Sequence, residues 1–338
     1  YKKIIFLNIH LNTYSHNTLK NKNLLILKFL KKLFFESKKN NLNFLKLFFP
    51  IFYTYLKYSN IFYFYKSKYL IHDRIYHTCP IRNFIFKKYG GEKIICLQTH
   101  LAEATISVFS DIDTLATFGK EKDTIQKLKF LGGKINNSTA CGSLRMEHEL
   151  KDENKCSTLE PIDILAIGLN PAIWRGTSNK ILEIYYEQMK WISKISTKFP
   201  KLKIVYKHHP NFTGDKIETK FINSSNIKTI VKPGNNLNSY HYLMRSNLVL
   251  SFGSTMILEG LSLGKKCFFL DPELKNTTFF GNLDYLKQFR ISKYEDLETI
   301  VRKNLINYQN GIMFEPEKFC LSHKEVSKKV YEYISGIN

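Results

Sequence analysis

The sequence predicts an α/β protein built from two Rossmann-like domains. Two stretches of its second half carry this prediction, KIVYKHHPN (203–211) and LVLSFGSTMILEGLSLGKKCFFLDP (248–272). Each begins as an apolar, β-rich strand, and the second continues through a short loop into a helix that ends at Gly264 and then into another strand. A strand–loop–helix–strand unit implies a parallel sheet, whose ligands sit at the carboxyl ends of the strands.

Strands and helices alternate on both sides of a polar segment. We expect an N-terminal domain over residues 1–150, a linker at 151–161 and a C-terminal domain over 162–338. EKIICLQTH (92–100) is an expected strand of the first domain, and IDILAIGLNP (162–171) opens the second with a buried strand. This order suggests two Rossmann-like halves facing a central cleft.

The first seventy residues are the most basic part of a chain whose net charge is +22. They hold 13 lysines and one acid, Glu36, and the segment 21–70 has no glycine. Its longest uncharged run, 47–56, is too short to cross a bilayer, which needs about 20 residues. A pair of amphipathic helices packed on the first domain explains this pattern. Lysines beside dense Phe and Tyr also suit an anionic membrane surface, and the hypothesis we test is that 22–68 contacts one.

Composition narrows the remaining function classes. The six cysteines form no Cys-x-x-Cys pair, so neither a zinc site nor a disulfide framework is indicated. With no recognisable signal peptide, we expect a cytoplasmic protein, and the lysine-rich segment leaves open a peripheral place on the inner face of the membrane. A P-loop and a GxGxxG fingerprint are both absent, which argues against a kinase or a dehydrogenase. A basic nucleic-acid-binding protein is the non-enzyme alternative, although no RNA- or DNA-binding module is recognisable.

Polar residues follow two of the predicted strands in the second half. His209 leaves a strand beside His208 and before Pro210, which prevents the strand from continuing. An imidazolium or a neutral N–H donor at this place offsets charge that grows on a leaving phosphate. The loop 253–255 opens a helix, so its backbone N–H groups and hydroxyls point where an anion binds, and the same hydroxyls serve as N-caps. Glu259 lies one helical turn further on.

The motif KHHP followed by SFGST-x3-E-x4-G-K resembles the nucleotide-binding half of bacterial surface-polysaccharide transferases with the glycosyltransferase B fold. This group includes sialyltransferases with an HP motif and a Ser/Thr motif, and CDP-glycerol glycerophosphotransferases. The resemblance implies that His209 contacts the donor phosphates and helps the nucleotide leave, and that Glu259 holds the ribose hydroxyls. The expected donor-binding residues are Lys207, His208, Pro210, Gly253, Ser254, Thr255, Glu259, Asn170 and Arg175.

The acceptor side needs a base that takes a proton from the attacking hydroxyl. His100 ends the strand at 92–100, and LQTH resembles the His-Gly strand exit of the glycerophosphotransferases, where the histidine is the proposed base. Leu101 replaces that glycine, so Glu103 and Asp73 are kept as alternatives. The acidic pair that the sialyltransferases place before glycine has no convincing copy, because GGEK carries one acid after its glycines.

Asp111-Ile-Asp113 matches the metal-binding DxD of another glycosyltransferase fold, but it precedes a strand of the N-terminal domain, so we expect no metal and no cofactor beyond the activated donor. The predicted function is an inverting, metal-independent glycosyltransferase. It would move a sugar from a CMP-, CDP- or UDP-linked donor to a surface-polysaccharide or lipid-linked glycan acceptor, with no nucleic-acid partner. The alternatives are a CDP-glycerol-type glycerophosphotransferase and a non-hydrolysing sugar-nucleotide epimerase, which shares the fold and the helix glutamate.

Overall fold

The computed structural model separates the chain into two units, residues 1–65 and residues 66–338. It describes residues 30–31, 34–35, 37–39, 41, 43–73, 79–99, 111–122, 125–126, 129, 133–151, 160–175, 179–211, 214–227, 229–231, 239–275, 284–303 and 316–336. Most of the expected linker at 151–161 therefore lies outside the described residues.

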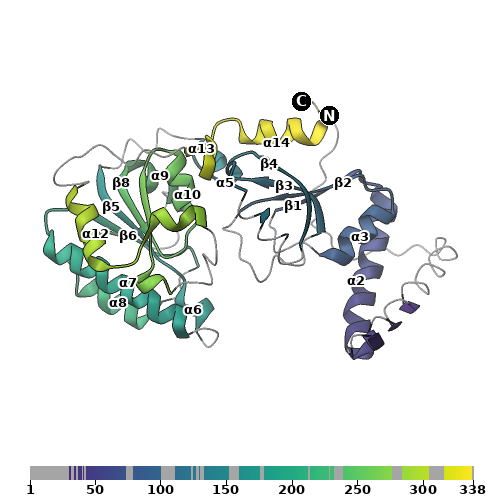
Figure 1. Ribbon diagram of the computed structural model, residues 1–338, viewed down its shortest axis with the longest axis horizontal. Helices are drawn as coiled ribbons and strands as arrows, with labels where there is room; N and C mark the ends of the chain where they lie inside the picture. Colours follow the sequence, from purple (N-terminus) through teal and green to yellow (C-terminus); the bar gives the residue numbers. More distant parts are fainter. Residues whose placement is uncertain are drawn as a thin grey trace. The chain divides into compact units, whose positions relative to one another are not determined.

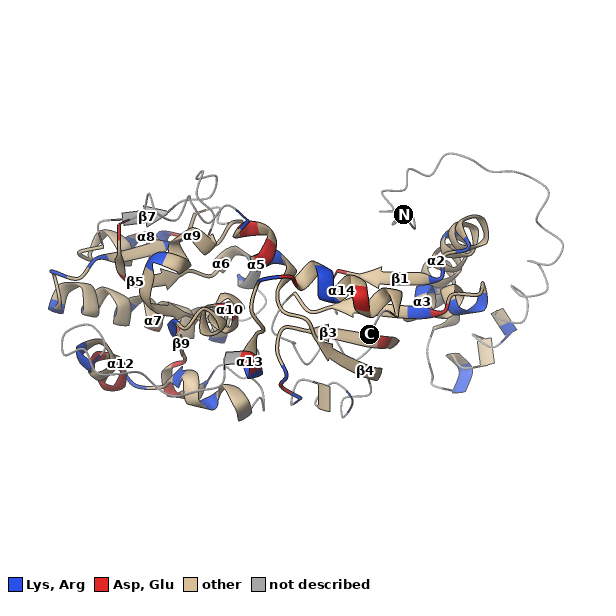
Figure 2. Ribbon diagram, turned by 90° about the horizontal axis from the view of Figure 1, so that it is seen from above, with Lys and Arg blue, Asp and Glu red and all other residues tan. Residues whose placement is uncertain are grey.

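The first unit contains helix α2 (Phe44–Tyr65), which has 22 residues. The absence of glycine from this stretch permits the helix in spite of Pro50 in its interior, and the hydroxyl of Thr54 donates to the Pro50 carbonyl at 2.7 Å. Its charged residues are lysines, with no Asp or Glu (Figure 2). Within the described part of the chain, no helix combines the length and the hydropathy that crossing a membrane requires.

The first sheet of the second unit has four parallel strands in the order β1-β2-β3-β4 (Figure 1). Its strands are β1 (Tyr69–His72), β2 (Lys93–Leu97), β3 (Asp111–Thr117) and β4 (Lys134–Ala140), with α3 (Pro80–Lys88) between β1 and β2 and α5 (Leu144–Glu149) after β4. Strand β1 was not predicted, because only four residues separate the lysine-rich segment from the loop that follows. Cys96 is fully buried in β2, as a small core residue should be.

The second sheet has six parallel strands in the order β10-β9-β8-β5-β6-β7. Its strands are β5 (Ile162–Ile167), β6 (Ile204–Lys207), β7 (Thr229–Val231), β8 (Ser246–Ser251), β9 (Lys266–Leu270) and β10 (Arg290–Ile291). The central strands β5 and β8 are almost entirely buried, which is why both read as continuous apolar runs. The strand–loop–helix–strand unit predicted at 248–272 is confirmed.

Helices pack around the second sheet and complete its core (Figure 1). They are α6 (Pro171–Trp174), α7 (Asn179–Lys198), α8 (Lys216–Asn223), α9 (Ser239–Arg245), α10 (Met256–Ser262) and α12 (Tyr294–Val301). One face of α7 is buried in the core. That face includes Gln188, whose amide donates to the carbonyl of Leu270 and is thereby satisfied.

The last helix, α14 (Val326–Ser335), packs on the first sheet. Its Tyr333 hydroxyl lies 2.8 Å from the Thr114 hydroxyl of β3. Val326 is fully buried against Ala116 of β3. We predicted this helix as part of the second domain. Its amphipathic pattern indicates which face is buried but not which sheet that face packs against. The predicted limits at 150 and 162 stay a prediction.

A second contact ties the C-terminal stretch to the exit of β3. The backbone N–H of Leu321 donates to the Phe118 carbonyl at 2.8 Å, and two further backbone hydrogen bonds join 120–121 to 317–318. A Cβ atom on Gly119 would lie 2.4 Å from the Lys318 carbonyl oxygen. Only glycine permits this approach. The stretch also includes α13 (Pro316–Phe319), which packs against α10 of the second sheet.

Candidate functional site

The exits of β5, β6 and β8 meet at one edge of the second sheet. Strand β5 pairs in parallel with β6 on one side and with β8 on the other, so the loops that follow the three strands are neighbours. These loops carry GLNP, KHHP and FGST. The HP loop and the Ser/Thr loop therefore share one carboxyl edge of the sheet.

Asn170 joins two of these loops. Its side-chain oxygen accepts from the Ala172 N–H at 3.2 Å and so caps α6, and its amide donates to the Asn211 carbonyl at 2.8 Å. The residue is 5% exposed. Asn170 thus fixes the β5 exit against the β6 exit, while its predicted contact with the donor stays a prediction.

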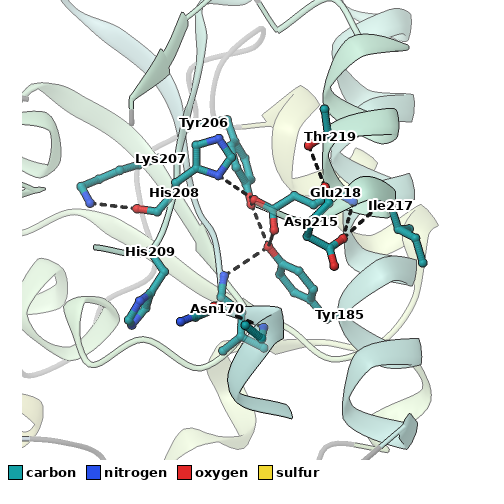
Figure 3. A network of polar contacts seen from close by, with 12 residues as sticks. Asn170, Tyr185, Tyr206, Lys207, His208, His209, Asp215, Ile217, Glu218 and Thr219 are labelled. Carbon is teal, nitrogen blue, oxygen red and sulfur yellow. Dashed lines mark hydrogen bonds and ion pairs between the residues drawn. The ribbon is translucent and has the colours of Figure 1, made fainter. Parts of the chain in front are cut away.

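His208 belongs to a buried network on the α8 side of β6. Its Nδ1 lies 2.7 Å from Oε1 of Glu218, which also accepts from the Tyr206 hydroxyl at 2.8 Å. The other carboxylate oxygen accepts from the Tyr185 hydroxyl at 2.9 Å. Figure 3 shows His208 directed toward Glu218, whereas Lys207 and His209 point away from this network. His208 therefore holds the loop after β6 in place from its buried side, a role that the sequence did not indicate.

Gly168 makes room for this network. A Cβ atom at this position would lie 2.3 Å from the Tyr206 hydroxyl oxygen. Burial raises the pKa of Tyr185 and of Tyr206 well above the ordinary value, and the charge of Glu218 adds to both shifts. Both phenols therefore stay protonated and act as donors. The local pattern Asp215-x-x-Glu218 marks a helix start in the sequence, but it gives no sign that the glutamate points to His208.

Arg175 lies on the far side of the same network. Its guanidinium donates to Oδ2 of Asp215 at 2.8 Å, and its own side chain is 63% exposed. Asp215 caps α8, because its other oxygen accepts the backbone N–H groups of Ile217 and Glu218. The described contact of Arg175 is thus with a capping carboxylate, and its predicted part in donor binding stays a prediction.

Lys207 and His209 lie at the exit of β6, and the charge of Arg145 acts on both; we call these three residues the cationic cluster. Burial, and then the charge of Arg145, lower the pKa of the Lys207 ammonium, which donates to the His208 carbonyl at 3.1 Å. Burial, followed by the charges of Lys207 and Arg145, lowers the pKa of His209. Arg145 is exposed at the start of α5, after the last strand of the first sheet. No local sequence pattern marks Arg145, because its helix follows the other sheet.

The ring of His209 has a defined tautomer when it is neutral. The Asn211 N–H donates to its Nδ1 at 3.1 Å, so the proton of the neutral imidazole is on Nε2. The lowered pKa favours this neutral form. His209 therefore presents an N–H donor from Nε2, as the sequence analysis allowed. Pro210 follows it at an exposed turn, where β6 has ended.

The loop after β8 stabilises its own turn. The Ser254 N–H donates to the Ser251 hydroxyl at 3.1 Å, and the Ser254 hydroxyl accepts the Met256 N–H at 3.3 Å. Thr255 already has helical backbone angles and makes no capping hydrogen bond through its side chain. Capping by Ser254 is thus observed, and phosphate binding by Gly253, Ser254 and Thr255 stays a prediction.

Glu259 links the helix after this loop to the first sheet. One carboxylate oxygen accepts from the Ser143 hydroxyl at 2.5 Å, and the Tyr240 hydroxyl lies 2.9 and 3.1 Å from the two oxygens. Glu259 is 2% exposed, and burial raises the pKa of its carboxyl. Ser143 also caps α5 by accepting the Met146 N–H. The carboxylate therefore braces the helix that carries Arg145, and its predicted hold on a ribose stays a prediction.

The candidate acceptor bases are less fully described. His100 and Glu103 lie outside the described residues. Asp73 is exposed directly after β1, next to the buried His72. His72 accepts from Arg82 on Nδ1, and its Nε2 lies 2.9 Å from Oδ1 of Asn83. Asp73 is thus the one candidate base in the described part of the chain, and the choice among the three stays a prediction.

The DxD residues lie inside β3, which starts at Asp111, and not before the strand as we predicted. Asp113 accepts the Ile94 N–H at 2.7 Å and pairs with the Lys87 ammonium at 2.6 Å. Its carboxylate therefore fastens β2 and α3 to β3. These contacts give Asp113 a structural role.

Comparisons with known proteins match the chain by structure. No protein-family model matches it, and no curated protein matches it in sequence. S. aureus MnaA, in a co-structure with UDP, aligns with a TM-score of 0.54 at 13% identity, covering 85% of this chain and 80% of that one. The UDP-GlcNAc 2-epimerase of Neisseria meningitidis bound to UDP-GlcNAc aligns at 0.53 and 13% identity, covering 83% and 80%. The Methanocaldococcus jannaschii UDP-GlcNAc 2-epimerase with UDP-GlcNAc and UDP gives 0.52 and 14%, covering 83% and 80%.

The fold is glycosyltransferase B-like. The likeness to these structures, together with two parallel sheets flanked by helices, confirms the predicted α/β class with two Rossmann-like domains. At such low identity the comparison concerns the fold alone. Membership of the sialyltransferase and glycerophosphotransferase group stays a prediction that rests on the KHHP and FGST motifs.

Proposed function

We propose that the chain is an enzyme of nucleotide-sugar metabolism that binds the diphosphate of its substrate with Arg145, Lys207 and His209. The observation that carries the proposal is the clustering of these groups at a carboxyl edge, where ligands of parallel sheets bind. Burial is the main cause that lowers the pKa of Lys207 and of His209, and repulsion by the charge of Arg145 adds to both shifts. A bound anion reduces this repulsion. That gain adds to the binding free energy that comes from the anion's direct contacts with the three side chains.

The activity we propose is sugar-nucleotide epimerisation. It is supported by the solved neighbours, two of which are UDP-GlcNAc 2-epimerases bound to UDP-GlcNAc. UDP is therefore the first nucleotide to test. Glycosyl transfer is the second candidate, because the KHHP and SFGST-x3-E motifs resemble those of the surface-polysaccharide transferases.

His209 would act on the diphosphate in either reaction. Its Nε2–H is free of the intraloop hydrogen bond, which uses Nδ1, and therefore suits donation to a phosphate oxygen. A donor fixed before the substrate arrives stabilises charge without reorganising. Asn170 and the His208–Glu218 pair would keep this loop in place during the reaction.

Titration calorimetry with UDP, CMP, CDP and GDP tests the binding proposal. Arg145→Ala, Lys207→Ala and His209→Ala should each weaken binding of the preferred nucleotide, since a charge-assisted contact contributes about 1.5–3 kcal/mol, or roughly ten- to hundredfold in Kd. Lys190→Ala, an exposed lysine paired with Glu187 on α7, is the matched control and should change nothing. Unchanged affinity in all three cluster variants would refute the assignment.

An acceptor-free reaction separates the two activities. The chain is incubated with UDP-GlcNAc alone, and the sugar signals are followed by proton NMR. A new epimer in the absence of any acceptor supports epimerisation. Consumption of the donor only after a glycan acceptor is added would favour glycosyl transfer, with the nucleotide site unchanged.

A further inference from the structure

Helix α2 exposes an apolar stripe, which Asn60 interrupts before Tyr63. Its members are Leu45, Phe49, Tyr53, Leu56 and Tyr63, which are 66%, 68%, 58%, 36% and 37% exposed. At about 100° per residue, their spacing places all five within an arc of about 80°. Single exposed apolar side chains are ordinary, but a contiguous row marks an interaction surface.

The charges around the α2 stripe have one sign. Lys46 and Lys57 lie about 20° and 40° beyond the edge formed by Tyr53 on the same helical projection. The acids nearest to the helix in sequence are Glu36 and Asp73, and the residues between them include six lysines. A surface that fits this helix therefore offers apolar groups to the stripe and anionic groups to the lysines beside it.

We propose that α2 lies on the surface of a bilayer that contains anionic phospholipid. The aromatic rings of the stripe would occupy the headgroup level, and the lysines beside them would reach the lipid phosphates. The helix would lie along the surface and not across it, because its 22 residues include two lysines and a proline. A second copy of this helix is a poorer occupant, because an antiparallel pair would bring Lys46 and Lys57 of one copy toward those of the other.

Co-sedimentation of the full chain with vesicles tests the proposal. The vesicles are made of phosphatidylcholine alone or of phosphatidylcholine mixed with phosphatidylglycerol. We expect at least tenfold stronger partitioning onto the anionic vesicles at low salt and a marked loss at high salt, because lipid charge attracts lysine within a Debye length. Equal or negligible binding to both vesicles would overturn the proposal.

Substitutions identify the surface that binds. Phe49→Ser/Tyr53→Ser should reduce partitioning more than tenfold, since the buried rings supply the apolar contact. Tyr331→Ser on α14 is the control, because Tyr331 is 57% exposed on another helix. Equal losses in the two variants, or none in the α2 variant, would contradict the assignment to α2.

A charge variant keeps the test decisive if the aromatic variant does not fold. Lys46→Gln/Lys57→Gln retains the apolar stripe, and each lost lysine should weaken binding to anionic vesicles about fivefold without changing binding to neutral ones. Size-exclusion chromatography without lipid is run on the same variants. A wild-type dimer that the Phe49→Ser/Tyr53→Ser change converts to a monomer would assign the stripe to a second copy and overturn the membrane proposal. UDP affinity, measured in parallel, should be the same in every α2 variant.

Discussion

Gly168→Ala is expected to lower the free energy of unfolding by more than the replacement of an ordinary glycine does. The new Cβ would lie 2.3 Å from the Tyr206 hydroxyl oxygen and 3.0 Å from the ring carbon that bears it. Tyr206 cannot retreat freely, since it is 1% exposed and hydrogen-bonded to Glu218 and Tyr185 at 2.8 and 2.7 Å.

The magnitude follows from these contacts. Overpacking of a filled core costs about 1–3 kcal/mol. Losing a hydrogen bond to a carboxylate costs about 1.5–3 kcal/mol more, and the reduced freedom of the unfolded chain returns about 0.4–1 kcal/mol. The free energy of unfolding should therefore fall by about 1.5–5.5 kcal/mol. Gly264→Ala is the comparator, because its site is open and only its left-handed φ of +70° is strained, at roughly 1–2 kcal/mol.

Urea denaturation followed by tryptophan fluorescence gives the measurement. The two tryptophans, Trp174 and Trp191, both lie in helices of the second sheet, so the signal reports on the part of the chain that is changed. Tyr206→Phe removes the clashing oxygen, so the double variant should lose at least about 1 kcal/mol less than the sum of the single losses. Strict additivity, or a loss below 1 kcal/mol for Gly168→Ala, would refute the reasoning.

Two further predictions use the same fluorescence signal. Asp215→Ala should lower the free energy of unfolding by about 1–2 kcal/mol through loss of the α8 cap. Arg175→Ala should cost less than about 1 kcal/mol, because the guanidinium is largely exposed to solvent and Asp215 keeps its hydrogen bonds from α8 and from Tyr186. Equal losses would contradict this. Burial raises the pKa of Glu259 above 4.5, so the contribution of this carboxyl to stability should be complete below pH 4.5 and should fall as the pH rises through the folded pKa. Glu259→Gln should abolish this pH dependence and still offer Ser143 an acceptor. A pH profile identical to that of the wild type would contradict it.

Local sequence patterns predicted those parts of the fold that depend on local physics. The strand–loop–helix–strand unit at 248–272 is an example, since an apolar run, a glycine-bearing loop and a helical period each act over a few residues. Strand β1 escaped prediction because four residues carry too little periodicity. The buried face of α7 was predictable from its period, and its partner strands were not.

The candidate site depended on contacts that no local pattern encodes. His208 and His209 are adjacent in sequence, yet His208 pairs with a buried carboxylate and His209 belongs to the cationic cluster. Only the direction of each side chain separates these roles. Arg145 joins the cluster through the Ser143–Glu259 hydrogen bond, whose residues are 116 positions apart. The positions of two residues in the sequence do not indicate whether they form such a pair.

The packing of α14 on the first sheet also affects the order in which a newly made chain can fold. Strand β4 ends at Ala140, and Val326, which buries the apolar face beside Ala116, follows about 180 residues later. At about 5–20 residues per second, a ribosome needs roughly 10–40 s to synthesise that interval. The nascent first sheet therefore waits, with this face uncovered, until the whole second sheet has been synthesised. A chaperone that binds exposed apolar strands has its longest opportunity during that interval, and a nonsense codon just before residue 326 would make the exposure permanent.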